Sequence, residues 1–244
     1  MFQLTLRKLD AISSTNNYIK DLISLNKLES GNGVWTLNQT KGYGQKGALW
    51  KGEPNKHLAL SFYNKIDNLS LNLIYSINCA SAMAVIDTLS IYQVPKLSVK
   101  WPNDILAGNK KICGILAENQ INGQKIKSII GIGINIYEKS FTKLPKATSV
   151  FLETNKSPLI KNFIEDLVKN INYYMSLCNN KSVNYLSKIF HKNLFSWKKK
   201  IKLNIEGIQV QAKIDKVEPN GLIKIEFEDG KMKHYQAKEI KIIY

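Results

Sequence analysis

The sequence predicts an α+β fold followed by a small β module. Up to about residue 195, segments with helical periodicity are interspersed with short, apolar, strand-like segments. From about Trp197 the pattern changes to short alternating strands, which are broken at Asn220-Gly221 and Asp229-Gly230. We therefore predict two units, residues 1–195 and residues 196–244, of which the second is a small β-barrel or sheet.

Local patterns place the elements of the first half of the chain. A Ser/Thr/Asn cluster at 13–16 precedes apolar residues at helical spacing, which predicts that a helix begins there. Strands are predicted at 33–39 and 57–63, on either side of a glycine-rich loop. The apolar segment 71–92 has the length and the small residues of a buried helix.

The second half of this unit begins with a short strand and a turn at Pro102. Asn122-Gly123 between the apolar segments 112–121 and 125–136 is a strong hairpin signal. An amphipathic helix is predicted to start at Pro158, and 183–195 continues helically. The apolar face of the helix is predicted to carry Leu159, Ile160, Phe163, Ile164, Leu167, Val168, Ile171 and Met175.

Charge and composition narrow the class of protein. The net charge is +16, but Arg7 is the only arginine, so lysine supplies nearly all of the positive charge. Readers of bases and phosphates usually need the planar fork of arginine, so we expect a solvated lysine surface and no DNA partner. No apolar run is expected to span a bilayer and no secretory signal is visible, so we expect a cytoplasmic location and no membrane.

The cysteines and histidines form no recognisable metal or disulfide pattern. Three cysteines and three histidines are widely spaced, and no C-x-x-C pair occurs. We therefore expect neither a disulfide framework nor a dedicated Cys/His metal site.

The loop GYGQKG, residues 42–47, matches the glycine fingerprint of dinucleotide-binding folds by its letters. In that fold a helix follows the loop, but here Gly52 and Pro54 stand where its second turn would be. No Gly-Lys-Ser/Thr closes the loop either, which excludes a P-loop. A lysine-bearing loop that wraps an anion remains, beside the alternative of a plain hairpin connection.

Two further stretches contain unusual residues. In KWPNDILAGNKKICGI, residues 100–115, a lysine that enters an apolar strand can point its ammonium into a pocket. The alternative is an Asx turn beside two surface lysines. In GIGIN, residues 131–135, two glycines on one face of a strand leave room for a ligand or for close backbone packing.

Together these stretches resemble the biotin–protein ligases, also called biotin–[acetyl-CoA-carboxylase] ligases. The resemblance lies in SSTN at 13–16, the spacing from Gln39 to Trp50, HLALS at 57–61, KWPNDI at 100–105, KICGIL at 111–116 and GIGIN at 131–135. It implies a mixed sheet flanked by helices, as in class II synthetases and biotin–lipoate ligases, with an SH3-like C-terminal barrel. It also implies the short form of the family, without an N-terminal DNA-binding domain.

The resemblance implies a reaction and a set of partners. Biotin reacts with ATP, with Mg²⁺ as cofactor, to give biotinyl-5′-AMP, and a lysine of the biotin carboxyl carrier protein of acetyl-CoA carboxylase or a related carboxylase then takes the biotin. A homodimer is possible within the family. Two alternatives stay open: a lipoate–protein ligase or octanoyltransferase of the same superfamily, and a basic nucleic-acid-binding protein.

The resemblance also assigns roles to residues. Lys111, Asp104 and Asn103 are the expected catalytic residues, with Asp104 as the expected Mg²⁺ ligand. The expected biotin contacts are Ser14, Thr15, Asn16, Gln39, Gly42, Gly44, Lys111, Gly114, Leu116, Gly131 and Gly133. The expected ATP and adenylate contacts are Tyr43, Gln45, Lys46, Trp50, Asn103, Lys111 and Asn135.

The glycine loop departs from the family pattern G-R-G-R-x-G-R. Tyr43, Gln45 and Ala48 occupy its arginine positions, and Lys46 is the only basic residue within the loop. Because Gln45 can donate hydrogen bonds but carries no charge, we expect weaker retention of the adenylate. His57 likewise stands where the family usually has asparagine.

Overall fold

A seven-stranded mixed sheet forms the centre of the molecule in the computed structural model. The structure describes residues 2–50, 52–67, 69–123, 125–142, 144–178 and 181–243, and of Lys46 it describes the backbone alone. β1 runs parallel to β2, and the other neighbouring strands are antiparallel. The strand order is β1 (Thr5–Lys8), β2 (Asn32–Thr36), β5 (His57–Asp67), β9 (Lys125–Asn135), β8 (Lys110–Asn122), β7 (Asp104–Ala107) and β6 (Leu97–Lys100). The sheet flanked by helices confirms the predicted α+β class.

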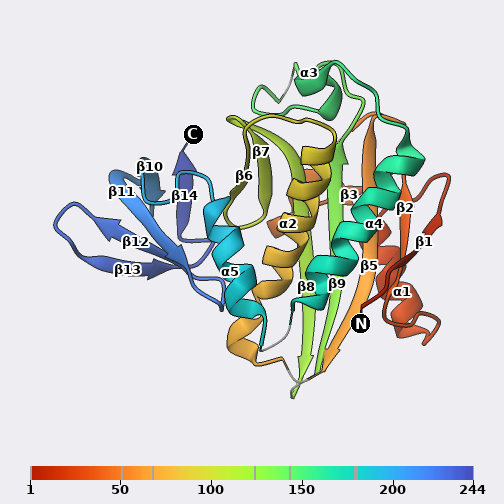
Figure 1. The fold of residues 1–244 in the computed structure, drawn as a ribbon, viewed down its shortest axis with the longest axis horizontal. Coiled ribbons are helices and arrows are strands. Elements are labelled where there is room, and N and C mark those ends of the chain that lie inside the picture. The colour runs from red at the N-terminus through yellow and green to blue at the C-terminus, as the bar shows by residue number, and fades with distance from the viewer. Residues whose placement is uncertain are drawn as a thin grey trace.

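Helices cover the sheet differently on its two faces. α2 (Ser76–Ile91) and α4 (Ile160–Ser176) lie together along one face, as Figure 1 shows. α1 (Thr15–Ser24) contacts β5 and β9, where the side chain of Ile19 packs with Ile129. Because successive strand residues point to opposite faces, Ile130 and Ile132 join the main core while their odd-numbered neighbours face α1. The α1 face therefore has room for a pocket.

α2 is buried on almost every side, as predicted for this apolar segment. Within the described part of the chain, Leu71–Ile91 is the one helical stretch long and apolar enough to cross a membrane. The expectation that no apolar run is long enough to span a bilayer is therefore wrong by length and composition. However, 72% of its most apolar window is buried inside the molecule, as in the core helix of a water-soluble fold.

The C-terminal strands form a second, five-stranded antiparallel sheet, consistent with an SH3-like module. Figure 1 shows it beside α5 (Val183–Lys192), at the end of the molecule opposite β1. Its order is β13 (Met232–Tyr235), β12 (Ile223–Phe227), β11 (Ile208–Val217), β10 (Lys200–Ile205) and β14 (Ile240–Ile243). The turns at Asn220-Gly221 and Asp229-Gly230 fall between β11 and β12 and between β12 and β13, as predicted.

Most predicted elements are confirmed, with small shifts. β8 and β9 form the predicted hairpin, and the α1 N-cap is Ser14. The helix predicted from Pro158 begins at Ile160, and Leu159 is 73% exposed, so its place on the apolar face is wrong. The strand β1 and the short helix α3 (Val150–Thr154) were not predicted. All three cysteines are buried and free.

Candidate active site

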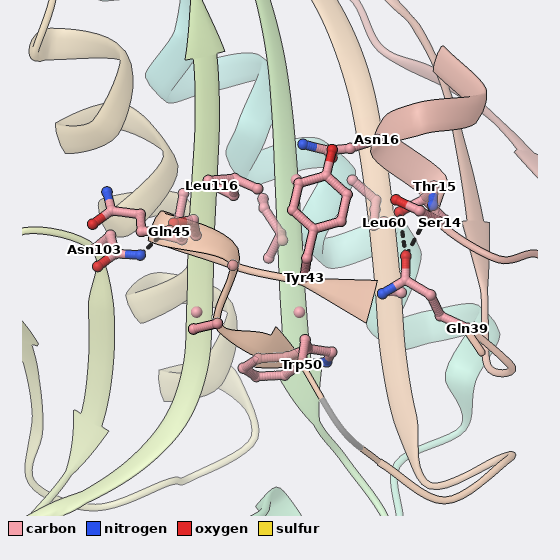
Figure 2. A pocket seen from close by; sticks show the side chains of 18 of the residues that line it. Ser14, Thr15, Asn16, Gln39, Tyr43, Gln45, Trp50, Leu60, Asn103 and Leu116 are labelled. Carbon is pink, nitrogen blue, oxygen red and sulfur yellow. Dashed lines mark hydrogen bonds between the residues drawn. The ribbon is translucent and has the colours of Figure 1, made fainter. Parts of the chain in front are cut away.

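A pocket of about 230 Å³ lies on the α1 face of the main sheet, covered by the glycine loop. This loop is a small hairpin, in which β3 (Gly42–Tyr43) pairs with β4 (Leu49–Trp50) and a 3-10 turn spans Gln45–Gly47. No α-helix follows the loop in the described residues up to β5, which agrees with the rejection of a dinucleotide site. Figure 2 shows the pocket between this hairpin and the strands beneath it.

One end of the pocket is a buried hydrogen-bond network at the start of α1. The Thr15 N–H and hydroxyl donate to Gln39 Oε1, at 2.9 and 3.0 Å. The Ser61 hydroxyl lies 2.7 Å from Thr15 Oγ1 and 2.6 Å from Asn16 Oδ1. Because buried polar groups are costly unless paired, this network holds each group in one orientation and suits a small polar ligand head.

The other end of the pocket is cationic. Lys111 Nζ lies 2.6 Å from Asp104 Oδ1, and Lys100 Nζ lies 3.7 Å from Asp104 Oδ2. Burial lowers the pKa of Lys100, Asp104 opposes that shift, and the Lys111 ammonium adds to it. Asn103 Nδ2 donates to the Ile115 carbonyl at 2.8 Å, which fixes its side chain beside Asp104. Two ammoniums around one carboxylate leave a net positive charge, which favours an anionic ligand.

Between these ends, glycines form a floor without side chains. A Cβ on Gly133 would lie 2.6 Å from the Trp50 indole, and one on Gly131 would lie 2.3 Å from Asn16 Oδ1. The indole therefore rests directly on the backbone of β9. Lys111 Nζ lies 5.4 Å from the ring centroid, within cation–π range. The buried Trp50 Nε1 has no hydrogen-bond partner among the described residues, so it is a donor to which a ligand acceptor could bind.

Two of the three loop residues at the family's arginine positions, Tyr43 and Gln45, face opposite ends of the pocket. Figure 2 shows Gln45 on the Asn103 side and Tyr43 on the Asn16 side. The Tyr43 hydroxyl lies 2.8 Å from Asn17 Oδ1 and 3.2 Å from Glu118 Oε2. Glu118 also accepts from Asn16 Nδ2 at 2.8 Å. Tyr43 thus connects the loop to α1 and β8.

Lys20 completes this group of side chains. Its Nζ lies 2.7 Å from Glu118 Oε1 and 3.1 Å from the Tyr43 hydroxyl. Burial by itself would raise the Glu118 pKa, but hydrogen bonds from Lys20, Asn16 and Tyr43 lower it below its ordinary value. Burial by itself would lower the Lys20 pKa, but the hydrogen bonds to Glu118 and Tyr43 raise it above its ordinary value. Both groups are therefore charged at neutral pH.

Most of the sequence-predicted site residues line this one pocket. They are Ser14, Thr15, Asn16, Gln39, Tyr43, Gly44, Gln45, Trp50, Asn103, Asp104, Lys111, Gly114, Leu116, Gly131 and Gly133. Gly42 and Asn135 do not line it. Gly42 lies against the Gln39 amide, and Asn135 Nδ2 donates to the Thr148 carbonyl at 2.9 Å. The Lys46 side chain lies outside the described residues.

Sequence reasoning missed several residues around the pocket. The apolar walls include Ala48, Leu49, Ala59, Leu60, Ile115 and Ile132. Lys20, Asn17, Ser61 and Glu118 were not assigned roles either. Glu118 could have been found from strand alternation, because Gly114, Leu116 and Glu118 share one face of β8.

Comparison with known proteins identifies the family. The model of the biotin/lipoate A/B protein ligase family matches residues 9–135, which is more than half of the chain. The chain belongs to the biotin/lipoate A/B protein ligase family. The matched range contains helix α1, the glycine loop and the strands β8 and β9. The family assignment therefore rests on the segments that build the pocket.

Individual members of this ligase family are similar over part of their length. The bifunctional ligase/repressor BirA of Bacillus spizizenii is 33% identical over 132 residues, which cover 54% of this chain and 40% of BirA. The biotin–[acetyl-CoA-carboxylase] ligase of Mycobacterium tuberculosis is 29% identical over 59% of this chain and 55% of its own. The chain thus spans less than two thirds of the curated relatives it matches.

A solved structure of the family has the same fold over nearly the whole chain. The biotin protein ligase of Aquifex aeolicus, in complex with biotin and ATP, superposes with a TM-score of 0.80 at 24% identity. The superposition covers 98% of each chain, the C-terminal sheet included. Both sheets therefore belong to one shared architecture.

Proposed function

We propose that the protein activates biotin with ATP and transfers the biotinyl group to a carrier protein. The observation that carries this proposal is a single pocket with a hydrogen-bonding end at Asn16 and a cationic end at Lys111. Biotin has a ureido ring at one end and a carboxylate at the other, so it needs a hydrogen-bonding end and a cationic end in its pocket. The names of relatives that act on biotin, and a ligase structure that holds biotin and ATP, support the same substrates.

The α1 end would hold the ureido ring. Ureido N–H groups need acceptors, and the ureido oxygen needs donors. Thr15, Asn16 and Gln39 offer amide and hydroxyl groups whose orientations are already fixed by bonds to one another. Leu60, Leu116 and Ile132 give the apolar wall that the thioether ring and the valeryl chain require.

Lys111 would carry the electrostatic part of the first step. A carboxylate oxygen of biotin attacks the α-phosphorus of ATP, the bond from that phosphorus to the β-phosphate oxygen breaks, and pyrophosphate leaves. Two anions must meet in this step, and an ammonium between them stabilises the charge that develops in the transition state. Asp104, at 2.6 Å, holds the Lys111 ammonium in place, and Asn103 would position the nucleotide.

In the second step a lysine amine of the carrier attacks the acyl carbon of biotinyl-5′-AMP, and AMP leaves with the bonding electrons. We propose that the carrier is the biotin carboxyl carrier protein of acetyl-CoA carboxylase or of a related carboxylase. The glycine hairpin over the pocket would exclude water, which would otherwise hydrolyse the mixed anhydride.

Mg²⁺ fits this site only together with ATP. Among the described residues, no group of three or more His, Cys, Asp or Glu side chains could hold a metal ion. Mg²⁺ is commonly bound by one or two carboxylates and the phosphates of its nucleotide, and Asp104 offers one carboxylate at the cationic end. When bound, the ion would neutralise triphosphate charge, and Asp104 would both hold it and orient Lys111.

Biotin-dependent exchange of labelled pyrophosphate into ATP tests the first step. We expect exchange with biotin but not with lipoate or octanoate, and a loss of about 10²- to 10³-fold in Lys111→Ala, typical for removal of one charge-stabilising group. Lys110→Ala is the matched control, because Lys110 precedes Lys111 in β8, is exposed and does not line the pocket. Full exchange in Lys111→Ala would contradict the role of Lys111, and exchange with lipoate alone would contradict the choice of substrate.

A further inference from the structure

The carboxylate of Glu118 is shared by two parts of the site that do different work. Its Oε2 accepts from Asn16 Nδ2 at 2.8 Å and lies 3.2 Å from the Tyr43 hydroxyl. Asn16 belongs to the end proposed for the biotin head, and Tyr43 belongs to the hairpin that covers the pocket. Lys20, at 2.7 Å from Oε1, balances the charge. One carboxylate oxygen of Glu118 thus contacts both Asn16 and the hairpin residue Tyr43.

Glu118 determines which way the Asn16 amide points. A carboxylate only accepts hydrogen bonds, so the amide nitrogen must face Glu118 and the amide oxygen must face the other way. That oxygen lies 2.6 Å from the Ser61 hydroxyl and directly over Gly131, on the pocket floor. With Glu118 in place, Asn16 presents an acceptor to a ligand N–H.

The Tyr43 side of the group depends on the residue that replaces the family arginine. A phenol oxygen can accept from Lys20 while its single proton goes to Asn17 or Glu118. A guanidinium has no acceptor and would stand as a second cation beside Lys20. An arginine could still donate to Asn17 and Glu118, but the contact from Lys20 requires an acceptor, which tyrosine at position 43 supplies.

We propose that Glu118 is a positioning residue that couples recognition by Asn16 to closure of the hairpin through Tyr43. The proposal rests on the proposed function only in taking biotin as the ligand that meets Asn16. A ligand that fixes Asn16 in its Glu118-bound orientation also keeps Oε2 in place for Tyr43, so the hairpin closes more firmly over an occupied pocket. By linkage, a closed hairpin holds the ligand more tightly to the same degree.

Limited trypsin digestion of the full chain without ligand tests the contact between the hairpin and α1. Lys46 within the loop and Lys41 directly before it are the cleavage sites, and mass spectrometry follows the peptides that end there. We expect Tyr43→Phe and Glu118→Gln each to raise the cleavage rate at these sites about 3- to 10-fold, as loss of one hydrogen bond does. Tyr92→Phe is the matched control, because its hydroxyl also bonds a carboxylate, that of Asp166 at 2.8 Å, away from the pocket. Unchanged rates in both test variants overturn the contact, whatever the substrate is.

The coupling is tested with ligand, on the wild type, Tyr43→Phe, Glu118→Gln and the double variant. We expect biotinyl-5′-AMP to dissociate about 3- to 10-fold faster from each single variant. In the double variant the increase should be smaller than the product of the two single increases, because Tyr43 keeps only its contacts with Asn17 and Lys20 once Glu118 is changed. Glu118→Gln alone should also raise KM for biotin, while kcat for exchange at saturating biotin stays near that of the wild type because Lys111 is untouched. Additive effects in the double variant, or a fall in kcat with KM unchanged, overturn the coupling.

Two further results keep the proposals separate. If Glu118→Gln does not fold, Lys20→Gln is used in its place, because it removes the charge partner of Glu118. Lys20→Gln must then raise the cleavage rate in the same digestion, and an unchanged rate overturns the proposal. If the wild type binds no biotin, the proposed function and the coupling both fail, and the digestion rates still decide whether Tyr43 holds the hairpin.

Discussion

The imidazole of His57 is buried in the sheet and is only half paired. Nδ1 lies 3.2 Å from the Glu53 carbonyl, which can only accept, so Nδ1 carries the proton. The buried Nε2 is then an acceptor that has no partner in the part of the chain that the structure describes. Burial lowers the His57 pKa, against smaller opposite effects of the Glu53 carbonyl and of Glu138. Protonation would place a charge in the sheet and add an Nε2–H that has no acceptor among the described residues.

This histidine predicts acid sensitivity of the fold. Because its pKa is lower in the folded state, the unfolded chain binds the extra proton first, and the free energy of unfolding falls as pH drops below about 6.5. We expect the melting temperature of the wild type to fall more steeply between pH 7.5 and 5.5 than that of His57→Asn. Calorimetric scans across this range measure both slopes, and parallel slopes would contradict the prediction.

At the scale of residues, the sequence was informative where several chemically unusual residues stand close together. Lys111, Asp104 and Asn103 lie within twelve positions of KWPNDILAGNKK, and the structure brings all three to one end of the pocket. Glu118 and Lys20 are ordinary charged residues in amphipathic elements, and such charges usually mark a solvated face. Their partner is the Tyr43 hydroxyl, and contacts between residues 23 and 75 positions apart are not visible in local patterns.

At the scale of elements, β9 forms the floor of the pocket because its glycines leave one face bare. Ala59 of β5 and Gly114 of β8 flank Gly133 in register, so the smallest side chains of three strands meet at one place. Alternation predicted which face would be bare, because Gly131 and Gly133 are two residues apart. It could not predict that Asn16 and Trp50 would rest there, since those contacts depend on how α1 and the loop fold back.

The bare floor gives a prediction for Gly131→Ala. The added Cβ would lie 2.3 Å from Asn16 Oδ1, so Asn16 must move and lose its present orientation. We expect KM for biotin to rise about 10- to 100-fold, as when hydrogen bonds to a buried polar group are lost, with the chain still folded. Pyrophosphate exchange at varied biotin gives KM, and a thermal melt controls for folding. An unchanged KM would show that Asn16 does not bind the ligand.

The ends of helices and strands were predictable where neighbouring residues set them, and not where distant contacts set them. Strong turn signals such as Asn122-Gly123 and Asp229-Gly230 set the hairpins correctly. Helix α4 starts two residues after Pro158, and Leu159 becomes its exposed N-cap, because the start depends on packing that periodicity does not contain. β1 has only four residues and is placed by parallel pairing with β2, a long-range contact.

At the scale of the whole molecule, the two sheets are joined beside the cationic end of the pocket. Trp101, next to the Asn103–Asp104 pair, donates from Nε1 to the Gly221 carbonyl at 3.0 Å. Tyr75, the N-cap of α2, donates its backbone N–H to the Pro219 carbonyl at 3.2 Å and its hydroxyl to the Pro102 carbonyl at 2.7 Å. Core residues of both sheets form one continuous hydrophobic cluster. The boundary at residue 196 stays a prediction, but the contacts favour one cooperative unit.

Gly221→Ala tests this cooperativity. Gly221 has a φ of +92°, which an L side chain rarely adopts, and an added Cβ would lie 2.9 Å from the Tyr75 ring. Backbone strain and overpacking together predict a loss of about 2 to 4 kcal/mol in the free energy of unfolding. In Gly230→Ala the φ is +78° but no atom lies within 4 Å of the new Cβ, so this control carries the strain without the clash and should cost less.

The C-terminal turn packs against Tyr75 at the start of α2, so a clash there strains both parts of the molecule. We therefore expect one calorimetric transition that moves as a whole to lower temperature in Gly221→Ala. Exchange activity should be lost across that same transition, since Trp101 links this turn to Asn103 and Asp104 at the cationic end of the pocket. Two transitions, of which only one moves, would mean that the sheets unfold separately. The C-terminal sheet would then be a module attached to the pocket and not part of what holds it in shape.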